Sequence, residues 1–227
     1  MLSAGELKKI VIIGAGRLAT HLGLTFFKHG ITIVQVFNRT HEKGRKLAGR
    51  IGADFTSDIG QLNLNADLYV LAVADSVLEE LASRLKLKDK LVVHTSGTIK
   101  MDVLSPISEN IGVLYPVQTF SQNRRIDFRT IPVCVESNSE KSLQQIADLA
   151  RKLTKRVYFL DSDKRRLLHL AAVFSSNFTN LLYAVSEELL LTRDIPFDLL
   201  KPLILQTARN VRAVSYTHLT LPTKRIV

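Results

Sequence analysis

The sequence contains a single cysteine and no apolar run long enough to cross a membrane. Cys134 therefore cannot form an internal disulfide. It lies within an apolar run at 131–135, which predicts a buried, unreactive thiol and a reducing compartment. The apolar run at 10–13 is too short for the core of a signal peptide and leads directly into Gly14. We therefore expect a cytoplasmic protein that does not insert into membranes.

Aromatic residues are also scarce, at 7%, and they are not interleaved with the basic residues. The formal net charge of +10 would suit an anionic ligand or a nucleic acid. However, the lysines and arginines occur in short clusters scattered along the chain, such as 164–166, which is typical of solvated surface charge. We expect no nucleic-acid partner and no metal site.

Two of the eleven glycines stand where an apolar run at 8–13 ends and a helix-like segment begins. In this G-x-G-x-x-A pattern the first glycine permits a tight turn, the second lets the backbone approach a phosphate, and Ala19 lets the helix pack on the strand. The helix N-terminus adds free N–H groups and a positive dipole end. The pattern predicts a dinucleotide site that includes Gly14, Ala15, Gly16, Arg17 and Leu18.

Apolar runs alternate with helical segments through the first 161 residues. Strands are expected at 8–13, 31–37, 53–55, 66–73, 90–94, 112–120, 131–136 and 157–160. This alternation predicts an α/β fold with a doubly wound, mostly parallel Rossmann sheet covered on both faces. Pro116 disfavours a central position for the whole of the sixth strand, and Ser139 is the expected N-cap of a helix at 139–153.

The composition changes after residue 161. Residues 163–193 form one helical stretch without glycine or proline, and a further helix is expected from residue 199. We therefore expect a Rossmann domain at 1–161 and an all-helical domain at 162–213. Residues 214–227 resemble a translated sequencing adapter, which predicts a foreign tail and an incomplete helical domain.

The residue that selects between NAD and NADP is expected at the end of the second strand, about 20 residues after the glycines. Asn38, Arg39 and Thr40 stand there, without the carboxylate that would accept from a ribose 2′-hydroxyl. Arg39 can pair with a 2′-phosphate, supported by Thr40 and by Lys43 or Arg45. The alternative is that Arg39 is a solvated loop residue. The spacing favours NADP over NAD.

The fourth and fifth strands are expected to end at the edge of the sheet where ligands of open α/β folds bind. Val73, Ala74 and Asp75 follow the fourth strand and are expected beside the cofactor, with Asp75 as the cap of the next helix. Ser96 follows the fifth strand and offers a hydroxyl near the nicotinamide. His94 is either a structural histidine or a substrate contact.

Mostly neutral polar side chains line one face of the long helical stretch. At about 100° per residue, His169, Ser176, Asn180, Tyr183 and Glu187 fall near one line, and Asn177 lies to one side. Because a solvated stripe would be richer in Lys and Glu, we expect either the wall of a cofactor cleft or a polar network between helices. In the first case His169 is the general acid or base, Ser176 or Ser96 donates to the substrate oxygen, and the two asparagines orient the substrate.

Together these motifs resemble a family of Rossmann-like NAD(P)-dependent oxidoreductases whose C-terminal part is a domain of unknown function. The resemblance rests on the glycine fingerprint and on residues 38–40, 94–97, 114–120 and 168–178, and it covers nearly all of 8–213. The family is similar to pyrroline-5-carboxylate reductases, deazaflavin-dependent NADP oxidoreductases and 6-phosphogluconate dehydrogenase-like proteins.

This resemblance implies a nicotinamide nucleotide, a small-molecule substrate and a helical domain that forms a homodimer in the full-length protein. It specifies no substrate. The expected function is hydride transfer to or from a small carbonyl or imine, with NADP favoured. The alternative is a protein that holds NADP(H) as a sensor or scaffold without catalysis.

Overall fold

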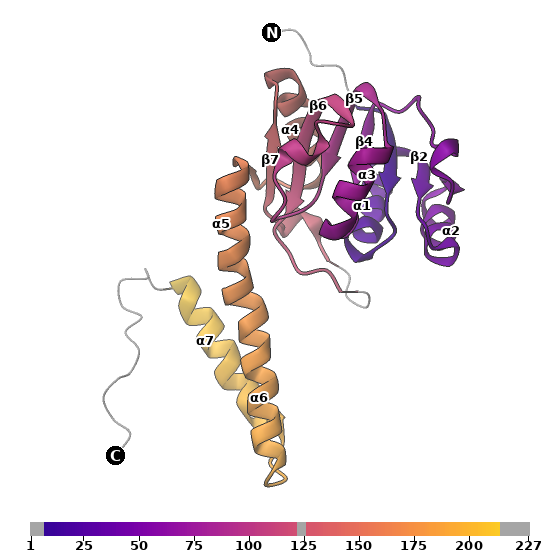
Figure 1. Ribbon diagram of the computed structural model, residues 1–227. Helices are drawn as coiled ribbons and strands as arrows, with labels where there is room; N and C mark the ends of the chain where they lie inside the picture. The colour runs from indigo at the N-terminus through magenta and orange to yellow at the C-terminus, as the bar shows by residue number, and fades with distance from the viewer. Residues whose placement is uncertain (1–6, 122–125, 214–227) are drawn as a thin grey trace. The chain divides into compact units, whose positions relative to one another are not determined.

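The computed structural model describes residues 7–121 and 126–213, and the chain divides into two compact units, Met1–Ala172 and Val173–Val227. The first unit contains one sheet in the order β3-β2-β1-β4-β5-β6-β7-β8 with helices on both faces (Figure 1). Its strands are β1 (Lys9–Ile13), β2 (Thr32–Phe37), β3 (Asp54–Thr56), β4 (Leu68–Leu71), β5 (Lys88–His94), β6 (Ser108–Pro116), β7 (Val133–Ser137) and β8 (Val157–Phe159). Its helices are α1 (Arg17–Lys28), α2 (His41–Ile51), α3 (Asp75–Arg84), α4 (Glu140–Leu153) and α5 (Ser162–Ala172). The Rossmann-like α/β architecture predicted from the sequence is confirmed.

Burial on both faces explains why the strands are continuous apolar runs. Ile10 and Ile12 of β1 belong to a cluster formed with α1, α2 and α4, whereas Val11 and Ile13 pack on the opposite face with α3. All four side chains have no exposed surface. A polar residue at any of these positions would lack water on either side of the sheet.

The sixth strand differs from its predicted bounds, and Pro116 ends it. β6 lies inside the sheet between β5 and β7, but it begins earlier than predicted and Pro116 is its last residue. At the end of the strand the missing N–H of Pro116 does not interrupt the hydrogen bonds of the sheet. The next residue, Val117, donates to the carbonyl of Pro132 at 2.8 Å. The β6–β7 pair is antiparallel, in contrast to the other adjacent pairs. The described part of its connection holds only a short 3-10 turn, Phe128–Thr130, and no crossover helix.

Two helix caps were predicted, with different outcomes. Ser139 is the N-cap of α4 and its hydroxyl accepts from the N–H of Ser142 at 3.2 Å, which confirms the prediction. Asp75 is not a cap, because Ala74 occupies the N-cap position and Asp75 is the first residue of α3. Its carboxylate is instead held by the hydroxyl of Thr98.

The second unit begins with a π-helical segment, Val173–Phe178, followed by α6 (Thr179–Leu191), a 3-10 turn (Phe197–Leu200) and α7 (Lys201–Ala213). The predicted stretch at 163–193 is therefore not one regular α-helix. Because a π segment has more residues per turn, the rotation of about 100° per residue does not hold through it. The common face of His169, Ser176 and Asn180 stays a prediction, as do the domain limits. Residues 214–227, the expected foreign tail, lie outside the described residues.

Candidate cofactor and catalytic site

Gly14 makes the turn at the carboxyl end of β1. Its φ of +116° lies in the region that favours glycine, and a Cβ at this position would lie 2.3 Å from the carbonyl oxygen of Ala72. Its N–H donates to the carbonyl of Phe37 at 2.8 Å. The turn thus touches the ends of both neighbouring strands, β2 and β4, at the point where the strand order reverses, where dinucleotides bind in this fold.

Gly16 leaves the N-terminus of α1 open. It is the N-cap residue, with no side-chain hydrogen bond to the helix, and no atom outside its immediate neighbours lies within 4 Å of its Cβ position. Arg17 is exposed, Leu18 is half-buried, and the first turn holds no acidic residue. Ala19 has no exposed surface. The helix N-terminus can therefore accept an anion such as a pyrophosphate.

Asn38 links this turn to the end of β2. Its Oδ1 accepts from the N–H of Ala15 at 3.0 Å, and its amide donates to the carbonyl of Thr40 at 2.8 Å. Thr40 is the N-cap of α2, and its side chain makes no capping hydrogen bond. The hydroxyl of Thr40 and the first N–H groups of α2 are thus available to a second anion.

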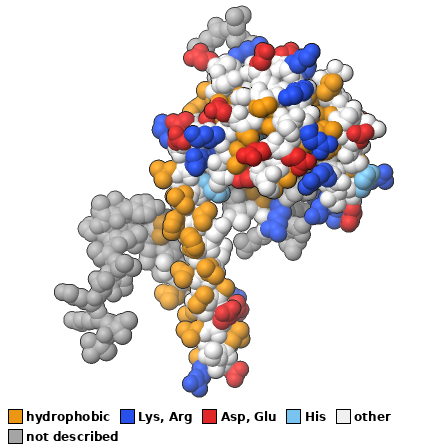
Figure 2. Space-filling view, in the orientation of Figure 1, with side chains coloured by type: hydrophobic (Ala, Val, Ile, Leu, Met, Phe, Trp, Pro, Cys, Tyr) orange, Lys and Arg blue, Asp and Glu red, His pale blue; other side chains and the backbone are white. Residues whose placement is uncertain are grey.

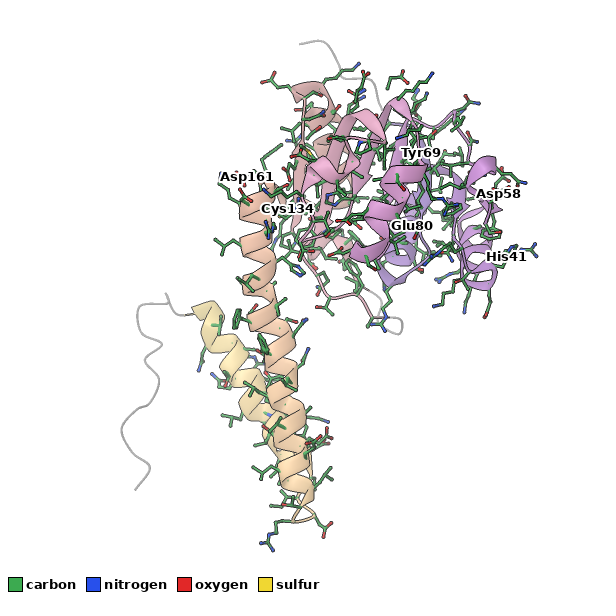
Figure 3. The ribbon with its side chains drawn as sticks, viewed as in Figure 1. His41, Asp58, Tyr69, Glu80, Cys134 and Asp161 are labelled. Atoms are coloured by element: carbon green, nitrogen blue, oxygen red, sulfur yellow. The ribbon has the colours of Figure 1, made fainter. Side chains whose placement is uncertain are left out.

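Arg39 lies beside this second helix N-terminus. Its side chain is 68% exposed, and its guanidinium is 3.9 Å from the carboxylate of Glu80, which is on α3 (Figure 3). An exposed ion pair at this distance contributes little stability, so a phosphate can displace it. Of the two supporting cations predicted, Lys43 is exposed, whereas Arg45 lies over the ring of Phe55 at 6.0 Å.

Val73, Ala74 and Asp75 follow β4 at the same edge, with Val73 half-buried and the other two exposed. A chain of hydroxyls joins Asp75 to Ser96 at the end of β5. Thr98 donates to the carboxylate of Asp75, so the Ser96 hydroxyl must donate to Thr98 Oγ1, 3.2 Å away.

Ser96 is also the acceptor of two backbone N–H groups, from Thr98 at 3.1 Å and Ile99 at 3.0 Å. Its hydroxyl is therefore fully engaged within the turn. This geometry suits the positioning of the loop, and the predicted contact between Ser96 and the substrate stays a prediction.

His94 is a buried structural histidine. It has no exposed surface, and its Nδ1 accepts from the N–H of Ser96 at 3.1 Å. Burial lowers the pKa of His94 to about 4, and the charge of Arg165 acts in the same direction. Asp75 and the backbone of Lys100 act in the opposite direction and raise the pKa. Nε2 of His94 has no hydrogen-bond partner in the part of the chain that the structure describes. The ring is therefore neutral near pH 7 and does not reach a ligand.

Arg165 of α5 ties the loop after β5 to β7. Its guanidinium donates to the carbonyls of Ser96 and Ile99 at 3.0 Å and to the carboxylate of Glu136 at 3.1 Å. The side chain of Arg165 has no exposed surface, and that of Glu136 is only 13% exposed. Glu136 also accepts from the N–H and hydroxyl of Ser162, where α5 begins, at 2.9 Å each. Burial lowers the pKa of Arg165, whereas the Glu136 carboxylate raises it.

His169 lies one helical turn further along α5, over the loop that Arg165 holds. A Cβ on Gly97 would lie 2.4 Å from His169 Nδ1, so the ring rests on the backbone of a residue that must be small. The hydroxyl of Tyr115, on β6, is 2.9 Å from the same nitrogen. Burial raises the pKa of Tyr115 to about 12, and that of the neighbouring Cys134 thiol (Figure 3) to about 11. Both groups therefore stay protonated near pH 7.

The predicted residues of the first unit thus follow the carboxyl ends of β1, β2, β4 and β5, and His169 joins them from α5. Ser176, Asn177 and Asn180 belong to the second unit, where Ser176 is half-buried and both asparagines are exposed. The sequence interpretation missed Tyr115, Glu136 and Arg165. It assigned the basic cluster at 164–166 to the surface, and for Arg165 this was wrong.

Residues 7–121 and 126–213 contain neither a metal-binding cluster nor a membrane-spanning helix. No group of three or more histidine, cysteine, aspartate or glutamate side chains could hold a metal ion. None of the helices in these ranges is long and apolar enough to cross a membrane.

Two family models match the chain. Residues 9–97 match the family model described as NADP oxidoreductase coenzyme F420-dependent, and residues 131–226 match a domain of unknown function (DUF2520). No curated protein sequence matches the chain. The predicted resemblance to NADP oxidoreductases with a C-terminal domain of unknown function is confirmed.

Solved structures show the same fold. One is a reductive aminase from Aspergillus terreus in complex with NADPH and ethyl-5-oxohexanoate, with a TM-score of 0.71 at 18% identity. The match covers 91% of this chain and 74% of the aminase chain. Another is a 1-pyrroline-5-carboxylate reductase from Streptococcus pyogenes, with a TM-score of 0.69 at 14% identity. This match covers 96% of this chain and 86% of the reductase chain. At these identities the likeness establishes the fold alone.

A third structure is much closer in sequence. It is described as a "putative NADP oxidoreductase" from Bacteroides fragilis and has a TM-score of 0.87. The match covers 97% of this chain and 86% of that one. At 42% identity over this length, the chain belongs to the same family as the Bacteroides fragilis NADP oxidoreductase.

Proposed function

We propose that this protein is an NADP-dependent oxidoreductase that transfers a hydride between the nicotinamide and a small carbonyl or imine. The observation that carries the proposal is the position of His169, which rests on Gly97 at the sheet edge that also presents the open helix N-terminus at Gly16. Bound NADPH would supply the hydride from C4 of its nicotinamide. His169 would hold and deliver the proton that the reduced oxygen or nitrogen needs.

The proposed cofactor contacts follow from the geometry of the two helix N-termini. Gly14, Ala15 and Gly16 would hold the pyrophosphate against α1, and Arg39 with Thr40 would hold the 2′-phosphate against α2. The fully buried Cys134 is compatible with the cytoplasmic location inferred from the sequence.

The direct test is to follow the oxidation of NADPH with a panel of small ketones, oxo-acids and cyclic imines. At least one substrate class should give turnover that depends on protein concentration. Tight binding of NADPH without turnover on any substrate would instead favour the sensor or scaffold alternative.

Removal of the Arg39 guanidinium tests the choice of cofactor. In Arg39→Ala, the loss of a charge-assisted bond to the 2′-phosphate should weaken NADPH binding about 10-fold or more, whereas NADH binding should change little. Titration calorimetry with both nucleotides measures this difference. Arg50→Ala, which removes an exposed arginine in the last turn of α2, is the matched control. Equal losses for NADPH and NADH in Arg39→Ala would contradict the assignment.

We further infer that the helical unit pairs with a second copy of the chain. Large apolar side chains of this unit are exposed, and α6 buries none of its residues. Figure 2 shows hydrophobic side chains gathered along it. The exposed apolar residues of the second unit include Phe174 (61% exposed), Leu182 (64%), Leu189 (70%), Leu199 (69%) and Leu203 (63%). Exposed apolar side chains gathered in this way are typical of an interaction site.

A charge on this surface should disrupt the pairing. Sedimentation of the full chain is expected to show a dimer, and Leu189→Lys should shift it toward monomer because the lysine would be buried unpaired. Leu64→Lys, at a leucine of the first unit that is 59% exposed, should leave the dimer intact. A wild-type monomer, or equal sedimentation of wild type and Leu189→Lys, would contradict the inference.

A further inference from the structure

Tyr115 and His169 form a side-chain pair whose members come from the sheet and from α5. The hydroxyl of Tyr115 lies 2.9 Å from His169 Nδ1, and the two rings are 6.0 Å apart at 65°. Tyr115 is only 8% exposed and belongs to a small apolar cluster with Val113 and Cys134. Its backbone is paired with Cys134 of β7, and its side chain is packed in this cluster, so its position is fixed.

The contacts at Nδ1 fix the orientation of the imidazole. Tyr115 occupies the hydrogen-bonding position of Nδ1, and the backbone of Gly97 lies against the same part of the ring. Nε2 is therefore the ring nitrogen that is left for an external partner. His169 is half-buried, so a ligand can reach it.

The pair also determines where the proton resides. In the neutral imidazole, a hydrogen bond donated by the Tyr115 hydroxyl to Nδ1 places the ring proton on Nε2, and this is the tautomer that we expect. In the imidazolium, Nδ1–H donates to the phenol oxygen instead, and Nε2 again carries a proton. A tyrosine hydroxyl can do both because it is a donor and an acceptor.

We propose that Tyr115 is the positioning residue of the reaction, and that it holds His169 so that Nε2–H is presented to the substrate. This inference rests on the proposed function. In the reduction of a carbonyl, bound NADPH would supply the hydride to the carbonyl carbon, and the oxygen, which receives the C=O π pair, would take the proton from Nε2 of the imidazolium. The products are NADP⁺ and the alcohol. The electron pair of the broken N–H bond stays on Nε2, which regains a proton from solvent.

The tautomer is measurable without any substrate. In the full chain, ¹⁵N spectra of the neutral histidine rings should show His169 with a protonated Nε2 and an unprotonated Nδ1. Tyr115→Phe should give a mixture of tautomers, whereas Tyr158→Phe, at a tyrosine that is 51% exposed, should leave the signals unchanged. His169→Gln assigns the signals by their loss. A wild-type Nδ1–H tautomer, or the same tautomer in Tyr115→Phe, would overturn the proposal.

A double-mutant cycle then separates positioning from a purely structural role. We expect Tyr115→Phe to lower kcat about 10-fold with little change in NADPH affinity, and to have no further effect in the His169→Gln background. An additional 10-fold loss in that background would show that Tyr115 acts independently of His169 and would overturn the proposal. If no substrate supports turnover in the wild type, the proposed function fails, and the ¹⁵N measurement still decides the role of Tyr115.

Discussion

Replacement of Arg165 with methionine is expected to lower the free energy of unfolding by about 3–5 kcal/mol. Methionine keeps most of the side-chain length but removes the guanidinium, so the largely buried Glu136 carboxylate loses its ion pair. The carbonyls of Ser96 and Ile99 lose their donors at the same time. A buried charge without a partner costs far more than the net contribution of the pair itself, because it has been taken out of water.

An exposed ion pair provides the control for this prediction. Arg129 and Asp127 are 2.8 Å apart, with side chains 79% and 48% exposed, and Arg129→Met should change the free energy of unfolding little. Urea unfolding of both variants gives the comparison. The double variant Arg165→Met/Glu136→Leu should recover part of the loss, since no buried charge remains. Similar losses in Arg165→Met and Arg129→Met would contradict the structural role assigned to Arg165.

Features set by short stretches of sequence could be predicted. The apolar strands, the Ser139 cap and the glycine turn follow from local spacing, because each depends on residues within about one helical turn of one another. The fold class follows from the alternation of such segments, and with it the edge of the sheet where a ligand binds. That is why the cofactor half of the site was predicted from Gly14, Gly16 and Arg39.

The proposed catalytic half depends on contacts between segments that are distant in the sequence. Tyr115 and His169 are 54 positions apart, and Arg165 reaches carbonyls 66 and 69 positions away. No spacing rule connects such residues, and a buried arginine in a basic cluster has the same sequence signature as a surface one. The π segment at Val173–Phe178 was missed for a related reason, because helical periodicity alone does not reveal an extra residue per turn.

Replacement of His169 with glutamine should cause the largest loss of activity, with kcat reduced about 100-fold or more. Glutamine can still donate a hydrogen bond near the position of the ring, but it cannot release a proton to the reduced oxygen near neutral pH. NADPH affinity should be nearly unchanged, because Gly14, Gly16 and Arg39 are retained. Steady-state kinetics with the best substrate of the panel, together with calorimetric titration of NADPH, measure both quantities.

His29→Gln is the matched control for this experiment. His29 is exposed at the C-cap of α1, where its ring contacts the carbonyl of Thr25 at 2.8 Å, and its loss should leave turnover unchanged. If His169→Gln keeps wild-type turnover, the proton must reach the substrate by another route, and His169 is not the general acid. If it instead loses NADPH binding while turnover at saturating NADPH persists, His169 contributes to the cofactor site. Only a loss of kcat at full NADPH occupancy assigns the proton to His169, because binding and chemistry are then separated in one protein.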